Sequence, residues 1–272
     1  MAKVSLVITV KDEKVTLTKQ TRIPDEVIII DARQNNKILN RSQGRNLGVK
    51  KAKGDIIAFT DAGCIPDKNW LAELVKPFTD KNVQVVSGYY RGNPKNIFEA
   101  CLVPYVLVMP DKVPEQFFPS TRSMAIRKSL FVKTGGFNEA VDPGEDFEYA
   151  NRLDKLGIKF YFAPKAVVSW RPRKNLKEAA WMFLRMAVGD IQAGLLRPKV
   201  KLLFLRYYVF FFLFFLNHWT ALLVIPYLIW AVAKNYRYVK DLRACFWLPV
   251  LQLTADICVI FGTIMGVLSK SK

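Results

Sequence analysis

The chain has 272 residues, long enough for one full-sized domain and an additional segment, and a formal net charge of +18 that requires an anionic partner or surface. Its one histidine and its four cysteines, which show no metal-ligand spacing, exclude histidine-based catalysis, a multi-histidine metal site and a disulfide framework. The sequence has no basic helix with interleaved aromatic residues, which argues against nucleic acid as the partner.

Short runs of β-branched and other apolar residues alternate with polar stretches in the first part of the chain. Such runs suit strands of a parallel sheet covered on both faces, and the polar stretches between them suit helices. The predicted strands cover residues 4–10, 27–30, 56–60 and 83–87, and the predicted helices cover residues 42–52, with Ser42 as a candidate cap, and 69–78. This alternation predicts an open α/β sheet, which binds ligands beyond the C-terminal ends of its strands.

Two aspartates have equivalent places in this pattern. Asp31 and Asp61 each follow a predicted strand, at the edge of the sheet where a ligand would lie. One such aspartate is often a turn former, but two in one sheet favour a binding site. A glycine-rich dinucleotide motif and a P-loop are both missing after the first strand, which argues against those two folds.

The later motifs offer a candidate base and a basic loop. Gly135-Gly136 marks a turn, and Glu145-Asp146 begins a predicted helix, where acids are favoured electrostatically. That position alone explains the two acids, and the alternative is that one of them is a general base. Residues 166–173 predict a short strand that leads into a basic loop, which either contacts phosphate or is simply solvated.

Two long apolar segments follow, at residues 207–233 and 244–268. Each exceeds the ~20 apolar residues that cross a bilayer core as a helix, so we predict two C-terminal membrane helices. Interfacial or re-entrant helices are the alternative, because Asn217-His218 and Pro226 interrupt the first segment. A carboxylate is costly in lipid, so Asp256 is expected to face the other helix or a polar cavity.

These segments predict a first domain at residues 1–195 and a membrane-associated region at 196–272. The start of the chain is too soon interrupted by Lys11, Asp12 and Glu13 to be a signal peptide, so we expect a catalytic domain in the cytosol, attached to the cell membrane. Basic residues flank both apolar segments, as expected beside anionic lipid head groups. They are Arg197, Lys199, Lys201, Arg206, Lys234, Arg237, Lys240, Arg243, Lys270 and Lys272.

Five motifs occur in a specific order between residue 4 and about residue 190. They are VSLVITVKDE from residue 4, PDEVIIIDA at 24–32, RNLGVKKAKGDIIAFTDAGCIPDKNWL at 45–71, RSMAIRKSLFVKTGGFNE at 122–139 and GEDFEYANRLDKLG at 144–157. In this order they resemble the family-2 inverting glycosyltransferases. The resemblance implies the GT-A nucleotide-diphospho-sugar transferase fold, with a mostly parallel open sheet flanked by helices, and a hexosyltransferase-type activity.

The resemblance also implies roles for individual residues, position by position. Asp146 matches the general base, and Glu145 beside it is expected to help place the acceptor. Arg122 and Ser123 fall where donor sugar and acceptor meet. The implied donor-binding residues are Thr9, Val10, Lys11, Asp31, Arg45 and Asp61, of which Asp31 contacts the nucleotide base and Asp61 holds a divalent cation, Mg²⁺ or Mn²⁺, on the diphosphate.

The chain departs from the family pattern at two positions. Gly63 stands where the metal-binding DxD signature has its second acid, although Mg²⁺ needs only one or two carboxylates besides phosphate oxygens. Ser169-Trp170 stands where some members have a histidine. Three arginines are candidates for cationic contacts with the diphosphate instead, namely Arg171, Arg173 and Arg185.

Two functions from different classes are consistent with these features. The first is a membrane-attached glycosyltransferase of cell-envelope glycan synthesis, which uses a UDP- or GDP-sugar and a lipid-linked or surface-glycan acceptor. The second is a degenerate membrane protein that binds a sugar nucleotide without turnover. The retained acids at positions 31, 61, 145 and 146 favour the enzyme.

Overall fold

The computed structural model describes residues 2–11, 15–34 and 37–270. Asp12, Glu13 and Lys272, which enter the sequence-based predictions, lie outside this range. The chain forms two compact units: unit 1 consists of Met1–Asn93 and Val108–Arg171, and unit 2 consists of Pro94–Leu107 and Pro172–Lys272. These units, which are defined by packing, differ from the predicted division after residue 195.

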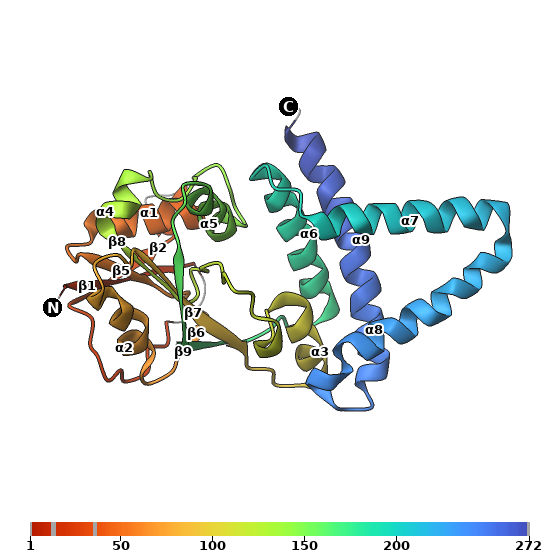
Figure 1. Ribbon diagram of the computed structural model, residues 1–272, viewed down its shortest axis with the longest axis horizontal. Helices are drawn as coiled ribbons and strands as arrows, with labels where there is room; N and C mark the ends of the chain where they lie inside the picture. The colour runs from red at the N-terminus through yellow and green to blue at the C-terminus, as the bar shows by residue number, and fades with distance from the viewer. Residues whose placement is uncertain (1, 12–14, 35–36, 271–272) are drawn as a thin grey trace. The chain divides into compact units, whose positions relative to one another are not determined.

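Unit 1 is built on a seven-stranded sheet in the order β2-β1-β5-β8-β7-β9-β6 (Figure 1). Its strands are β1 (Val4–Val10), β2 (Glu26–Asp31), β5 (Ile56–Phe59), β6 (Cys64–Pro66), β7 (Val85–Gly92), β8 (Met124–Arg127) and β9 (Phe160–Trp170). A separate two-stranded ribbon pairs β3 (Arg33–Gln34) with β4 (Lys37–Ile38).

The sheet is mixed, and the prediction of a mostly parallel sheet is wrong. Strand β1 is parallel to β2 and β5, and β7 is parallel to β9. Strand β8 runs antiparallel to both β5 and β7, and β6 runs antiparallel to β9. The sequence pattern missed β8 because its four residues are too few to show a strand period, although they pair in the middle of the sheet.

Helices cover both faces of the sheet. The helical elements of unit 1 are α1 (Arg41–Lys51), α2 (Trp70–Val75) with the 3-10 turn η1 (Lys76–Thr79), η2 (Pro110–Lys112), α4 (Lys128–Lys133) and α5 (Glu145–Lys155). Figure 1 shows α2 on one face and α1, α4 and α5 on the other. Alternate residues of β1 and β5 enter two separate apolar cores, for example Ile56 and Ala58 with Trp70, and Ile57 and Phe59 with α1, α4 and α5. This burial on both sides explains the unbroken apolar runs of the central strands.

The cap of α1 is Asn40, so the prediction of Ser42 is wrong. Asn40 Oδ1 accepts from the Gln43 backbone N–H at 2.9 Å, and the Gln43 side chain accepts from the Asn40 N–H at 3.1 Å. The two bonds form a reciprocal capping box. The Ser42 hydroxyl instead donates to the carbonyl of Val141 at 3.1 Å, which ties α1 to the loop before α5.

Unit 2 is helical, with the bounds α3 (Ile97–Val106), α6 (Leu176–Gln192), α7 (Pro198–Leu216), η3 (His218–Leu223), α8 (Val224–Val239) and α9 (Ala244–Lys270). Of the helices in the described part of the chain, one, at Ala244–Ser269, is long and apolar enough to cross a membrane by length and composition. The prediction of two such helices is therefore confirmed for the second segment only.

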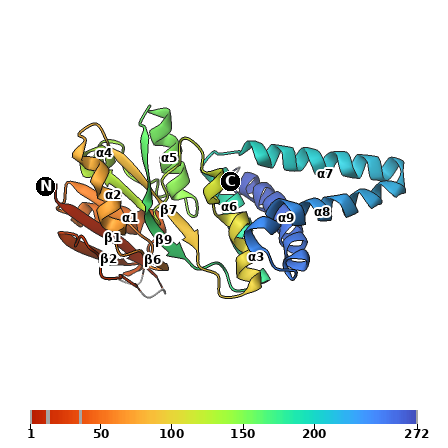
Figure 2. The ribbon, with the colours of Figure 1, turned by 60° about the horizontal axis from the view of Figure 1, so that its bottom comes forward.

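The first apolar segment is two helices joined by a 3-10 turn. Asn217 has an extended backbone (φ −151°, ψ 112°), and its side chain accepts from the Trp219 N–H at 3.0 Å, so it ends α7 and caps η3. Pro226 lies in the first turn of α8, where a missing N–H costs little. Figures 1 and 2 show α7 and α8 meeting at η3 as a hairpin, which we call the α7–α8 hairpin.

The carboxylate of Asp256 joins the three C-terminal helices of unit 2. Its Oδ2 accepts from Arg206 Nη2 at 2.8 Å, from Tyr207 OH at 3.0 Å and from Tyr227 OH. Its Oδ1 accepts from Gln252 Nε2 at 3.0 Å. A nearly fully buried acid in the middle of an apolar helix is thus paired with α7 and α8, and it has a structural role.

We predict that Asp256→Ala lowers the stability of unit 2, because it removes these four hydrogen bonds and leaves Arg206 without its partner. A loss of about 2–3 kcal/mol corresponds to a Tm lower by roughly 5–10 °C in a chain of this size. Thermal unfolding of the detergent-purified protein measures the change. The control Asp241→Ala removes a partly exposed acid that pairs only with the neighbouring Arg243 among the described residues, and it should lower Tm much less. Equal effects of the two variants would contradict the structural role of Asp256.

Candidate functional site

Arg45 brings together two acids from distant parts of unit 1. Its Nη2 donates to Asp61 Oδ1 at 2.7 Å, and its Nη1 donates to Glu145 Oε1. Asp61 lies two residues after the end of β5, and Glu145 is the first residue of α5. Arg45 and Glu145 are almost fully buried, whereas a third of the Asp61 side chain is exposed. The structure therefore places Asp61 and the start of α5 at one site.

Two glycines let α1 approach the sheet closely enough for this contact. A Cβ added to Gly44 would lie 2.6 Å from Thr9 Cγ2, and one added to Gly48 would lie 2.3 Å from Val7 Cγ1. Because neither glycine has a side chain, α1 lies directly on β1. Arg45, the residue after Gly44, then reaches Asp61 beyond the end of the neighbouring strand β5.

Arg122 supplies a second arginine, held by aromatic rings. Its guanidinium carbon lies 5.4 Å from the ring centre of Tyr90 and 5.1 Å from that of Trp170, both within cation–π range. Its carbonyl accepts from the Thr60 hydroxyl at 3.0 Å, which fixes the loop beside β5. The sequence did not predict a role for Tyr90, and Trp170 was noted only at the position where some family members have a histidine.

Asp146 is held by the loop that contains Arg122. Its Oδ2 accepts from the Ser120 hydroxyl at 2.7 Å, and its Oδ1 accepts from the Phe147 N–H at 2.8 Å. The carboxylate is only partly buried, so a substrate hydroxyl can reach it. Ser120 was not predicted as a site residue, because it lies two residues before the motif that begins at Arg122.

Ser123 belongs to the core. It is fully buried, accepts from Trp70 Nε1 at 2.8 Å and donates to the carbonyl of Ala166 at 3.1 Å. These bonds join the loop to α2 and β9. The structure therefore gives no support to a substrate contact by Ser123, and Ser120 and Arg122 are the members of the loop that face the acids.

The other predicted residues lie in different parts of the chain. Asp31 ends β2 beside Val10, is exposed, and accepts from the Arg33 N–H at 2.8 Å. Lys11 follows β1 and is also exposed. Arg171 ends unit 1, whereas Arg173 and Arg185 belong to unit 2. Contacts of these three arginines with a diphosphate remain predictions.

Charge–charge interactions dominate the electrostatics of the site. Burial alone would raise the pKa of Asp61, but the charges of Arg45, Arg122 and Arg41 outweigh it and hold the pKa below its usual value. Burial alone would lower the pKa of Arg45, but Asp61 and Glu145 raise it above its usual value. Burial and the charge of Asp61 raise the pKa of the Cys64 thiol to about 12, so this cysteine is no nucleophile at neutral pH.

Three buried polar atoms at the site have no hydrogen-bond partner within the described residues. They are Thr9 Oγ1, Arg122 Nε and Glu145 Oε2. Buried polar atoms are nearly always paired, so each of these atoms is available to a group of a bound molecule. An acceptor on that molecule would satisfy Arg122 Nε, and a donor would satisfy Glu145 Oε2.

These residues do not fit a divalent cation held by the protein alone. Asp61 already forms an ion pair with Arg45, and Arg122 and Arg41 add positive charge around it. Across residues 2–11, 15–34 and 37–270, no group of three or more His, Cys, Asp or Glu side chains is placed to hold a metal ion. One carboxylate surrounded by arginines is a poor cation site, so no chemical step is assigned here to a metal.

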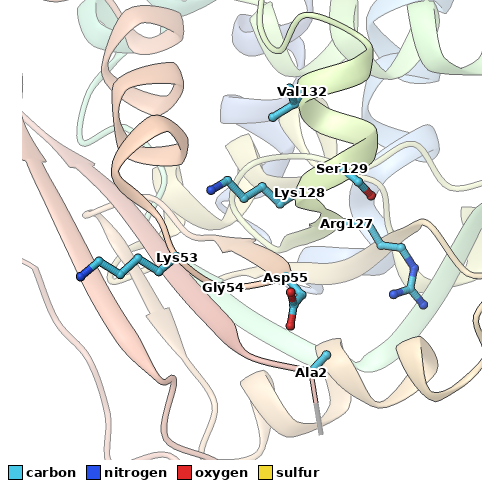
Figure 3. A pocket seen from close by; sticks show the side chains of 8 residues that line it. All are labelled: Ala2, Lys53, Gly54, Asp55, Arg127, Lys128, Ser129 and Val132. Carbon is cyan, nitrogen blue, oxygen red and sulfur yellow. The ribbon is translucent and has the colours of Figure 1, made fainter.

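A hollow of about 700 Å³ lies at the other end of the strands (Figure 3). It is lined by Asp55, which precedes β5, by Arg127, the last residue of β8, and by Lys128, the first residue of α4. Their polar groups already bind the fold: Lys128 Nζ donates to the Ala52 carbonyl at 2.6 Å, and Arg127 Nε donates to the Val83 carbonyl at 2.9 Å. This hollow is separate from the acids and carries no argument for chemistry.

We predict that Arg45→Met destabilises unit 1 by about 3 kcal/mol, because it leaves the buried Glu145 carboxylate without its cation. The double variant Arg45→Met/Glu145→Gln should recover part of this loss, since an amide costs less to bury than an unpaired carboxylate. Urea unfolding of both variants measures the difference. No recovery in the double variant would show that the ion pair is not the source of the loss.

Sequence comparisons identify relatives for part of the chain. Residues 11–133, less than half of the chain, match Glycosyl transferase family 2. A pre-mycofactocin glycosyltransferase of Mycobacterium tuberculosis (strain H37Rv) is 28% identical over 162 residues, which are 56% of this chain and 34% of that protein. The O-antigen chain rhamnosyltransferase WbaN of Salmonella anatum is 27% identical over 194 residues, 58% of this chain and 62% of that protein. The chain thus spans about a third to three fifths of the length of these relatives.

The fold has a solved counterpart. The structure of the mannosyltransferase PcManGT from Pyrobaculum calidifontis, in complex with GDP-Man and Mn²⁺, gives a TM-score of 0.60 at 17% identity and covers 99% of this chain and 88% of that chain. This likeness shows a GT-A-like α/β fold. Together with the match over residues 11–133, it supports a family 2 glycosyltransferase.

Proposed function

We propose that this chain is a membrane-attached glycosyltransferase that moves a sugar from a nucleotide sugar to an acceptor by inverting single displacement. The observation that carries the proposal is the cluster of Asp61, Glu145 and Asp146 around Arg45 and Arg122, at the end of strand β5. Two of these acids lie outside the segment that matches the family, so their placement at Asp61 is independent support.

In this proposal Asp146 is the general base. The acceptor hydroxyl gives its proton to the Asp146 carboxylate while its oxygen attacks the anomeric carbon of the donor. The bond from that carbon to the diphosphate oxygen breaks, and its electron pair leaves with the nucleoside diphosphate. The Ser120 hydroxyl holds Asp146 Oδ2 and the Phe147 N–H holds Oδ1, which fixes the orientation of the base.

The remaining roles follow from burial and position. Arg45 is too deeply buried to bind a donor directly, so we assign it as a positioning residue that acts through Asp61 and Glu145. Thr9, Val10 and Lys11 at the end of β1 and Asp31 at the end of β2 are proposed to contact the nucleotide, because ligands of such sheets bind beyond the strand ends.

We propose that a lipid bilayer covers the α7–α8 hairpin. Its arms diverge from η3 in Figure 1, so neither arm buries the other. Large apolar side chains stay exposed along it, and they include Phe211, Phe212, Phe215, Leu216, Trp219, Leu222, Leu223, Ile225 and Ile229. Basic residues lie at its two ends away from η3, among them Arg197, Lys199, Lys201, Lys234, Arg237 and Lys240. An apolar tip with basic ends matches acyl chains below anionic head groups.

Attachment to a bilayer also restricts the class of acceptor that the enzyme meets. An enzyme held at a membrane meets acceptors at that surface, so we propose a lipid-linked or surface-glycan acceptor of cell-envelope synthesis. We place unit 1 on the cytosolic side. The four cysteines, of which Cys64 and Cys101 are buried, are all free thiols, which fits a reducing compartment.

We predict that Asp146→Asn lowers the rate of sugar transfer by a factor of about 10²–10⁴, because an amide cannot accept the proton of the acceptor. Donor affinity should stay unchanged. Release of nucleoside diphosphate from UDP- and GDP-sugars, with membranes that supply acceptors, measures the rate. The control Asp154→Asn changes an acid on the exposed side of the same helix and should keep wild-type activity. Unchanged turnover of Asp146→Asn would remove its assignment as base.

The same assay separates the enzyme from the non-catalytic alternative. A degenerate sugar-nucleotide-binding protein would bind the donor and release no nucleoside diphosphate, in the wild type as in Asp146→Asn. The structure gives no feature that favours this second function, since the acids and their hydrogen bonds are in place.

We predict that Trp219 enters the acyl-chain region of the bilayer, because it is 77% exposed in η3 at the tip of the hairpin. Lipids brominated on the acyl chain should quench part of the tryptophan fluorescence of the reconstituted protein. Trp219→Phe should lower the quenched fraction, whereas Trp70→Phe, which changes a ring buried in unit 1, should not lower it. Equal quenching of wild type and Trp219→Phe would contradict insertion of the tip.

A further inference from the structure

We propose that Arg122, and not a protein-held divalent cation, offsets the negative charge that develops on the donor diphosphate as its bond to the sugar breaks. The inference rests on the proposed function and concerns the same site. It differs from the sequence-based expectation, which gave the charge to a metal on Asp61 or to Arg171, Arg173 and Arg185.

Two aromatic rings hold the Arg122 guanidinium in place. Tyr90 and Trp170 contact its guanidinium through their ring faces, at 5.4 and 5.1 Å from the ring centres. Ring faces fix the position of a cation without using its N–H groups. Arg122 Nε is buried and has no acceptor within the described residues. A guanidinium that is positioned but not hydrogen-bonded is prepared to bind phosphate oxygens, to which arginine binds strongly.

The two other arginines that act on Asp61 already have ion-pair partners. Arg45 donates to both Asp61 and Glu145. Arg41 forms an ion pair with Asp142 at 3.6 Å. Arg122 interacts electrostatically with Asp61 and Asp146 but forms no ion pair with either of them within the described part of the chain. Of the three arginines around Asp61, Arg122 is therefore the one whose buried Nε–H has no acceptor among the described residues.

The positive charge around Asp61 disfavours a metal ion on its carboxylate. A divalent cation on this carboxylate would be repelled by Arg45, Arg122 and Arg41, all of which act on Asp61. The second acid that would offset this repulsion is replaced by Gly63. Cationic side chains stabilise a departing diphosphate as a metal ion does, and a preorganised guanidinium needs no rearrangement during the reaction.

The position of Gly63 offers a test in the opposite direction. No heavy atom of the described residues lies within 4 Å of the place that a Cβ on Gly63 would take. A carboxylate therefore fits there without displacing its neighbours. Gly63→Asp adds the missing acid two residues after Asp61, and should create metal dependence where the wild type has none.

The decisive experiment measures binding, not transfer. UDP and GDP are titrated into the full-length protein in detergent, first with EDTA and then with Mn²⁺. We expect the wild type to bind at least one of them equally well in both conditions. Arg122→Gln should weaken binding in EDTA about tenfold or more, the effect of losing a hydrogen bond to a charged group. Arg122→Lys keeps the charge but not the planar fork, so its nucleotide affinity in EDTA should lie between those of the wild type and Arg122→Gln.

The matched control is Arg91→Gln, which removes one positive charge from the residue after Tyr90 on β7. Successive side chains of a strand point to opposite faces, and Arg91 binds Asp67 and Ser169. The Arg91→Gln variant should bind the nucleotide with the same affinity as the wild type. The double variant Arg122→Gln/Gly63→Asp should bind weakly in EDTA and regain affinity with Mn²⁺.

The outcomes distinguish this inference from the proposed function. Wild-type binding that requires Mn²⁺, or equal affinity of Arg122→Gln and wild type, would overturn the inference even if sugar transfer occurs. Metal-independent binding that depends on Arg122, without transfer to any acceptor, would support the inference and leave the catalytic proposal refuted. No binding of either nucleotide in either condition would refute both.

Discussion

The contact of Arg45 with Asp61 and Glu145 is the interaction on which the rest of the site depends. It joins a helix, a strand end and the start of a second helix, and Arg45 and Glu145 are 100 residues apart in the sequence. Burial makes the contact necessary, because Arg45 or Glu145 alone would be a costly unpaired charge in the protein interior. Once it forms, the beginning of α5 is fixed relative to β5, and Asp146, the next residue, is directed toward the loop of Ser120 and Arg122.

The mixed sheet serves the same arrangement. Strand β8 enters between β5 and β7 in the antiparallel sense, so the loop that precedes it runs past the end of β5. A parallel strand at this position would begin at the opposite edge and would carry Arg122 away from Asp61. The reversal of one four-residue strand therefore puts a cation and an acid from different motifs at one edge of the sheet. Ser123, buried against Trp70 and Ala166, fixes this loop from inside the core.

Unit 2 shows how a polar group can organise an apolar region. Helices α7 and α8 have few buried residues. The side chain of Asp256 on α9 connects both of them to α9. Asn217 does the converse: it interrupts the apolar run and turns one long segment into two arms of a hairpin. The exposed aromatic residues at the tip of this hairpin and the basic residues at its ends are the features on which the proposed membrane contact rests.

The sequence by itself determined the strands β1, β2 and β5, the acids at their ends, the helix that begins at Glu145 and the long apolar helix at the C-terminus, because each depends on local pattern and composition. It also identified the motifs that resemble family-2 glycosyltransferases. The tertiary structure decided what the period of a short run cannot show: the direction of β8, the cap at Asn40 and the break at Asn217. It also decided the difference between Ser123 and Ser120, since both are hydroxyls in one loop and only packing tells which is buried. The tertiary structure also decided the partners of Arg122, because Tyr90 and Trp170 contact it only when β7 and β9 pair.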